Sequence, residues 1–139
     1  MIYQHRVQYY ETDRMGVTHH SNYIRFMEEA RGYIMEQWGW PYAKCEKMGL
    51  MCPVISLNNI EYKNPTTYDD VIDIHVFVLD CERVRLRIGY HMYVGDKLVF
   101  KGESGHVFLN TEGRPVSLKR SYPELYQLYV QHMEAQGEF

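Results

Sequence analysis

Cysteine is scarce in this chain and is nowhere paired. The three cysteines, Cys45, Cys52 and Cys81, are widely spaced, and no CxxC pair occurs. Disulfide scaffolds need an even number of cysteines and zinc knuckles need close pairs, so neither organises this fold. We expect reduced thiols, which are typical of a cytoplasmic protein.

Long hydrophobic runs and clusters of one charge sign are also missing. No apolar stretch approaches the roughly 20 residues that a membrane-spanning helix needs, and residues 1–6 lack the apolar centre of a signal peptide. The net charge is −3 and no basic stripe occurs, which disfavours nucleic-acid binding. Without repeats, linkers or low-complexity segments, the sequence predicts one cytoplasmic domain over residues 1–139, with no membrane span.

What the chain does have is a regular spacing of apolar residues, and this spacing changes along its length. Alternation predicts strands at residues 2–10, 54–62, 71–79, 84–94 and 97–109, the last two joined by the hairpin turn Gly95-Asp96. After the first strand, apolar residues three and four positions apart predict a long helix that ends at Gly39. Ser21 or Asn22 is expected to cap its start, and charged residues such as Glu29 and Arg31 lie mostly off its apolar stripe. That stripe, expected in the core, comprises Tyr23, Phe26, Met27, Ala30, Tyr33, Ile34 and Trp38.

A shorter helix is predicted after Pro123. One long helix beside five strands favours an α+β fold, in which the helix packs against an antiparallel sheet. We expect neither edge of this open sheet to be covered by its own chain. Pairing between subunits is the usual remedy for such edges.

Polar residues are dense between the first strand and the long helix. A carboxylate near the first N–H groups of a helix can act on a bound carbonyl group, and a glycine lets the backbone approach a ligand. Asp13, Gly16, His19 and His20 therefore predict a catalytic site. The ordinary alternatives are an Asx turn for Asp13, a surface position for His19 and a cap or loop brace for Asn22. Two adjacent histidines are weak spacing for metal ligands, so we expect no metal.

The segment resembles the start of the central helix in hotdog-fold thioesterases, and more narrowly in the 4-hydroxybenzoyl-CoA and YbgC-type acyl-CoA thioesterases. Their pattern is Y-x-x-T-D-x-x-G-V-x-x-H-x-N-Y, and here one fewer residue separates Tyr10 from Thr12-Asp13. The matching landmarks are Tyr10 to Tyr23, Tyr62-Lys63-Asn64-Pro65, Asp69-Asp70 and Gly113-Arg114-Pro115. The resemblance implies a five-stranded sheet wrapped around the long central helix, dimers often paired into tetramers, active sites at the dimer interface and no cofactor.

The same resemblance implies roles for individual residues. Asp13 would be the catalytic carboxylate, as nucleophile or as general base, and the His20 N–H would polarise the thioester oxygen, with the His20 ring a second participant. Substrate contacts are expected nearby, from Gly16, Val17, His19, Asn22 and Tyr23. Cations are expected to meet the phosphates of coenzyme A, although each is alternatively an ordinary solvated side chain. These cations are Lys63, Arg114, Lys119 and Arg120.

The predicted function is therefore hydrolysis of an acyl-CoA to a free acid and coenzyme A. One rival is a hotdog hydratase acting on an enoyl thioester, whose signature we do not find. Another is a non-catalytic acyl-CoA-binding regulator, usually fused to a DNA-binding segment that is not seen here. A third is a partner of a lipid-synthesis complex. The sequence leaves open the acyl group, and whether coenzyme A or an acyl-carrier protein carries it.

Overall fold

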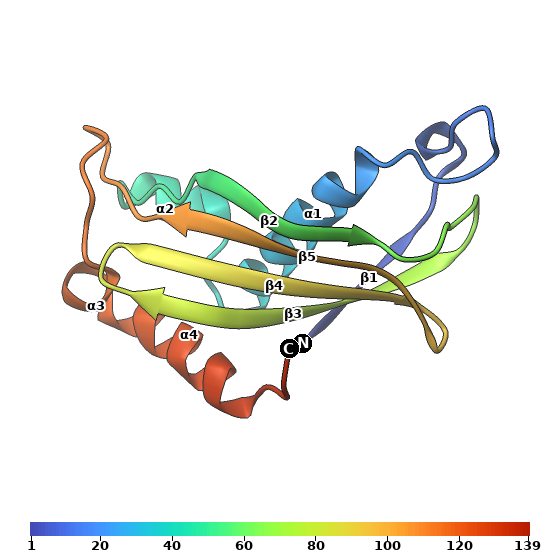
Figure 1. Cartoon of the computed structure of the whole chain (residues 1–139). Helices are drawn as coiled ribbons and strands as arrows, with labels where there is room; N and C mark the ends of the chain where they lie inside the picture. The colour runs from blue at the N-terminus through green and yellow to red at the C-terminus, as the bar shows by residue number, and fades with distance from the viewer.

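The structure is a computed structural model that describes residues 1–139. Its five strands form one antiparallel sheet in the order β1-β3-β4-β5-β2 (Figure 1). The predicted α+β architecture is confirmed. In chain order the elements are β1 (Ile2–Arg6), the 3-10 helix η1 (Tyr9–Glu11), α1 (Asn22–Gln37), α2 (Tyr42–Lys47), β2 (Val54–Tyr62), β3 (Val71–Glu82), β4 (Arg85–Val94), β5 (Lys97–Val107), α3 (Leu118–Ser121) and α4 (Pro123–Ala135).

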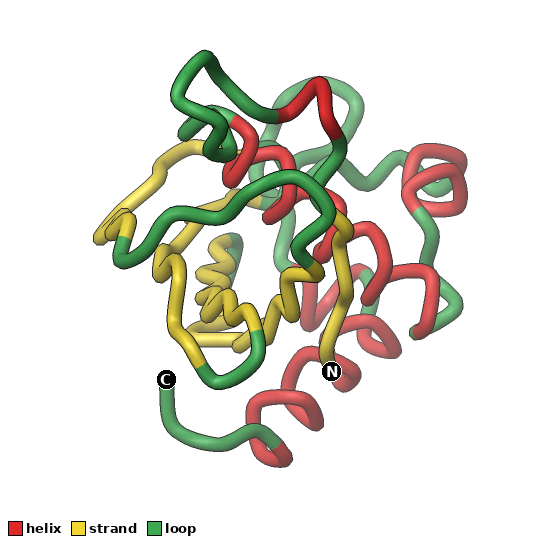
Figure 2. The backbone as a smooth tube through the Cα atoms, turned by 90° about the vertical axis from the view of Figure 1, so that its right-hand side faces the viewer, coloured by secondary structure: helices red, strands yellow, loops and turns green.

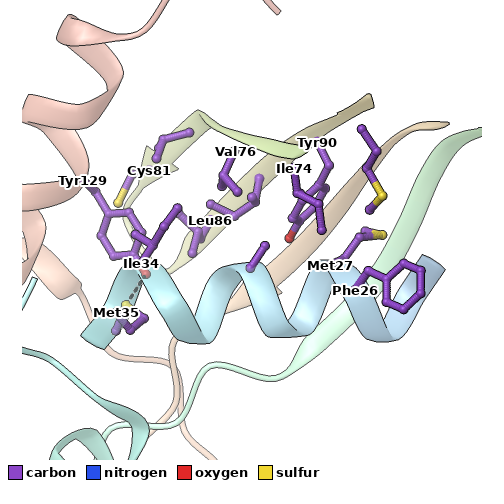
Figure 3. Close-up of a cluster of buried hydrophobic side chains, with 14 of the residues drawn as sticks. Phe26, Met27, Ile34, Met35, Ile74, Val76, Cys81, Leu86, Tyr90 and Tyr129 are labelled. Carbon is purple, nitrogen blue, oxygen red and sulfur yellow. Dashed lines mark hydrogen bonds between the residues drawn. The ribbon is translucent and has the colours of Figure 1, made fainter. Parts of the chain in front are cut away.

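Helix α1 packs its apolar stripe against the sheet. Viewed along the strands, the sheet is a curved layer with helices beside it (Figure 2). Met27 of α1 lies beside Ile74 and Tyr90 of the sheet, and Ile34 lies nearer the other end of the helix beside Leu86 and Tyr129 (Figure 3). Burying side chains of this size contributes about 1.5–3 kcal/mol each, so this contact supplies much of the drive for folding. Of the predicted stripe only Tyr33 and Trp38 remain half-buried.

The first strand and the helix cap differ from the sequence prediction. β1 ends at Arg6, because the chain then turns into η1, where the Glu11 carboxylate accepts a 2.8 Å hydrogen bond from the Gln8 N–H. The predicted side-chain cap on α1 is wrong. Ser21 already has helical backbone angles, and its hydroxyl lies 2.9 Å from His19 Nδ1. The Asn22 side chain instead donates to the Glu11 carbonyl at 2.8 Å, as a loop brace.

One edge of the sheet is partly covered by the chain, and the other is open. β1 covers only the first half of β3. Side chains of α4 and of Gln136, which follows it, cover part of the rest: His132 Nε2 lies 3.0 Å from the Val76 carbonyl, and Gln136 exchanges two 2.8 Å hydrogen bonds with Val78. This corrects the expectation that neither edge is covered. At the other edge nothing pairs with the outer side of β2, whose Ile55 is 52% exposed.

Candidate functional site

The loop that carries Asp13 folds back on itself as a small hairpin. The Asp13 N–H donates to the Val17 carbonyl at 2.8 Å, and Thr12 pairs with Thr18 in an isolated bridge. Gly16 closes the tip with a φ of 80°, a left-handed conformation that favours glycine. The hairpin therefore holds Asp13 at a fixed place ahead of α1.

The Asp13 carboxylate has one engaged oxygen. Its Oδ1 accepts a 2.8 Å hydrogen bond from the Met15 N–H, which is the Asx turn that the sequence offered as the ordinary alternative. The side chain is half-buried, and its Oδ2 has no hydrogen-bond partner within the chain. The turn therefore orients the carboxylate and leaves one oxygen available.

The start of α1 presents unused backbone donors. The His20 N–H makes no hydrogen bond within the chain, while the His20 carbonyl accepts one from the Tyr62 hydroxyl at 3.0 Å. The His20 ring is exposed and lies 4.2 Å, centre to centre, from the ring of His19. Unpaired N–H groups and the helix dipole make this end attractive to an oxygen that gains negative charge.

A buried polar network lies beneath the hairpin, and its residues were not among those predicted from the sequence. His5 lies between two carboxylates: its Nε2 is 2.8 Å from Glu11 Oε1, and its Nδ1 is 3.0 Å from Glu29 Oε1. The Glu11 carbonyl accepts from the His19 N–H at 2.8 Å and from the Asn22 side chain. The available clue was that His5 and Val7 alternate on one face of the strand predicted over residues 2–10.

The other residues predicted beside Asp13 take different positions. Tyr23 lies in the core, where its ring stacks on Phe100 and its hydroxyl lies 2.9 Å from Thr66 Oγ1. Val17 is half-buried and pairs with Thr67 in an isolated bridge. The hairpin is thus fixed to the segment after β2 as well as to α1.

The predicted phosphate-binding cations do not gather around Asp13 within one chain. Lys63 follows β2 at the Tyr62 end, near His20, and forms a 2.9 Å ion pair with Glu61. Three further cations lie at the opposite end of the molecule, beyond the start of β2 (Figure 1). These are the exposed residues Arg114, Lys119 and Arg120.

A cavity of about 330 Å³ opens between the second half of α1, α2, the start of β2 and α4. Its walls are mainly apolar, and none of the residues predicted as a site from the sequence lines it. The apolar part includes Trp38, Val54, Leu86 and Tyr129. No sequence pattern indicates this cavity, because its lining comes from elements far apart in the chain.

Three basic side chains, Arg31, His106 and His132, also line the cavity. Arg31 Nη1 donates to the Tyr90 hydroxyl at 2.9 Å, the Tyr90 hydroxyl lies 2.7 Å from Ser104 Oγ, and Ser104 Oγ lies 2.8 Å from His106 Nε2. Burial, reinforced by the Arg31 cation, lowers the pKa of His106 to about 4. Arg31 is therefore the charged member of this network at neutral pH.

Residues 7–128 match the thioesterase-like superfamily. The chain belongs to the thioesterase-like superfamily. This membership makes the protein a thioester hydrolase with the hotdog fold, as the resemblance implied. The narrower 4-hydroxybenzoyl-CoA and YbgC-type grouping stays a prediction.

Known proteins are similar to this chain over most of its length. A candidate esterase from Aquifex aeolicus is 40% identical over 89% of this chain and 95% of its own length. YneP of Bacillus subtilis, a candidate acyl-CoA thioesterase, is 32% identical over 88% of this chain and 90% of its own. The structure of a DHNA-CoA thioesterase from Staphylococcus aureus superposes with a TM-score of 0.88 at 29% identity, covering 99% of this chain and 95% of that one.

The structure contains no group of three or more histidine, cysteine, aspartate or glutamate side chains arranged to hold a metal ion. No helix is both long and apolar enough to cross a membrane.

Proposed function

We propose that this protein hydrolyses acyl-CoA thioesters and that Asp13 and the His20 N–H perform the reaction. The observation that carries the proposal is the pairing of a fixed carboxylate, with one free oxygen, and a helix start with an unused N–H on the same short loop. The names of YneP and of the S. aureus DHNA-CoA thioesterase support coenzyme A as the carrier.

Thioester hydrolysis needs few protein groups besides the Asp13 carboxylate and the His20 N–H. Water adds to the thioester carbonyl, the bond from carbon to sulfur breaks, and the thiolate leaves with a proton as coenzyme A. Asp13 either attacks first, giving an acyl anhydride that water opens, or removes a proton from the attacking water. The His20 N–H stabilises the charge that develops on the carbonyl oxygen, a contribution of about 2.7–4 kcal/mol for one preorganised donor.

We further propose that β2 pairs with β2 of a second copy. Its open edge and its exposed apolar residues, among them Val54, Ile55 and Leu57, support this. Antiparallel pairing about a two-fold axis sets the Val54 end of one strand beside the partner's Tyr62 end. The part of each cavity lined by Cys52 to Val54 then faces the partner's Asp13 loop.

The same pairing gives the distant cations a role. Arg114, Lys119 and Arg120 of one protomer lie near the start of its β2, and so approach the loop of the partner subunit. Together with Lys63 at the end of that partner's β2, they supply positive charge for the phosphates of coenzyme A.

Release of free thiol from a panel of acyl-CoAs tests the proposed activity. Short, long, branched and aromatic acyl groups belong in the panel, together with the same groups on an acyl-carrier protein. Turnover of any coenzyme A ester supports the proposal. Turnover confined to the carrier-protein esters would move the substrate to that carrier, and tight binding without turnover would favour a binding module instead.

A further inference from the structure

Arg31 is an unusual residue for the wall of an apolar cavity. It is half-buried on α1, and no carboxylate lies within 4.0 Å of its guanidinium. Its neighbours are the hydroxyl groups of Tyr90, at 2.9 Å, and Tyr42. A guanidinium has five N–H donors, and two phenols accept only a minority of them. The remaining donors are unmatched within the chain.

No carboxylate of the chain forms an ion pair with the Arg31 guanidinium. Behind it, the network continues through Tyr90 and Ser104 to His106, which is neutral at pH 7, and ends 3.4 Å from the Cys52 carbonyl. Glu28 and Glu46 also line the cavity, but both are exposed and neither forms an ion pair with Arg31. Partly removing a cation from water without a counter-ion is unfavourable, so the site favours an anionic ligand.

We propose that this cavity binds the distal carboxylate of the acyl group, with Arg31 as its receptor, which makes ω-carboxyacyl thioesters the preferred substrate class. The inference rests on the proposed function, because the thioester is what the Asp13 loop would cleave. The apolar walls take the methylene chain, and the fork of Arg31 matches a carboxylate with two parallel hydrogen bonds. Arg31 sets specificity and takes no part in bond breaking.

The substrate preference expected with Arg31 is the opposite of the one expected for a purely apolar cavity. If only the walls mattered, a methyl-ended chain would be the better substrate at every length, because a carboxylate loses its hydration on entry. With Arg31 as receptor, the carboxyl-ended chain is better at the length that reaches the guanidinium. The acyl-chain length with the highest kcat/KM then gives the distance from the thioester to the Arg31 guanidinium.

The experiment measures kcat/KM for pairs of acyl-CoAs of equal length, one ending in a methyl group and the other in a carboxylate, from four to twelve carbons. We expect the carboxyl-ended partner to be favoured by about 30-fold or more at its best length, as for a hydrogen-bonded buried charge. Preference for the methyl-ended partner at all lengths would overturn the inference while leaving the thioesterase proposal intact.

Two variants at Arg31 and one control sharpen the result. In Arg31→Met the preference should reverse in favour of methyl-ended chains. In Arg31→Lys, which keeps the charge but loses the fork, the preference should weaken and keep its direction. Lys47→Met removes an exposed cation of α2 outside the cavity and should keep the wild-type preference. An unchanged preference in Arg31→Met would refute the role of Arg31, and if that variant does not fold, Arg31→Lys and the wild-type series decide.

A binding measurement separates this inference from the proposed activity. Octanoate and octanamide differ only in charge and shape at one end, and calorimetry with the wild-type protein compares them without any hydrolysis. We expect octanoate to bind at least about tenfold more tightly, and Arg31→Met to abolish the difference. Absence of turnover on every thioester would defeat the proposed function alone, whereas equal binding of the two probes would defeat the Arg31 site alone.

Discussion

Replacing Glu11 with alanine removes the centre of the network beneath the Asp13 hairpin. The Glu11 side chain is buried, and its Oε1 lies 2.8 Å from both His5 Nε2 and the Gln8 N–H. Removing this carboxylate leaves the Gln8 N–H and one ring nitrogen of His5 without their partner, and each buried unsatisfied group costs about 1–3 kcal/mol. Because His5 keeps its contact with Glu29, we expect a loss of about 3 kcal/mol in the free energy of unfolding.

Urea unfolding measures this loss. With a typical dependence on urea of about 1–3 kcal/mol per molar, the midpoint should fall by about 1 M or more. Glu11→Gln keeps an oxygen acceptor and should lose only about 1–2 kcal/mol. Glu36→Ala, at an exposed site on the same helix as Glu29, is the control. A midpoint for Glu11→Ala within about 0.3 M of wild type would show that the network does not brace the loop.

Two further predictions concern the cavity network and the open sheet edge. Burial gives His106 a pKa of about 4 in the folded protein, against its ordinary value of 6.5 in the unfolded chain. The stability that the neutral ring contributes is therefore complete above pH 6.5 and is lost as the pH falls toward 4. In urea unfolding, His106→Gln should lose about 3 kcal/mol less stability over that range than wild type. Ile55→Lys on β2 should yield a folded monomer without thioesterase activity, as judged by light scattering and thiol release, whereas Met48→Lys, also exposed, should remain associated and active.

The strands and the long helix were predictable because local pattern determines them. Alternation located the long strands, and the turn Gly95-Asp96 does join Val94 to Lys97 as a hairpin. The end of β1 was not predictable, since it depends on Glu11 turning inward to meet His5. The missing cap on α1 has a similar cause, because the Asn22 side chain is engaged by the Glu11 carbonyl rather than by the helix.

The candidate site was predictable only in part. Asp13 and His20 stand in one continuous segment, so the sequence displays them together. Arg31 was placed among the charged residues off the apolar stripe, where a solvated side chain is the usual expectation. Its surroundings come from Tyr90 on β4 and from Tyr42 on α2, which are brought beside it only by folding. A cavity lined by residues of three helices and four strands leaves no local pattern.

Asp13 combines the two interpretations that the sequence offered. The Asx turn and the proposed catalytic role use different oxygens of one carboxylate, so the first does not exclude the second. An asparagine at this position keeps an oxygen that accepts from the Met15 N–H, but it has no carboxylate to attack or to take a proton. Asp13→Asn therefore separates chemistry from loop structure.

The most direct test of the account is kcat for Asp13→Asn on the best acyl-CoA, beside Asp96→Asn in the exposed β4–β5 turn as control. The account predicts a fall of about 100-fold or more for Asp13→Asn, an unchanged urea midpoint, and wild-type activity in the control. A kcat within a few-fold of wild type in a folded Asp13→Asn protein would contradict the central claim that this carboxylate performs the hydrolysis.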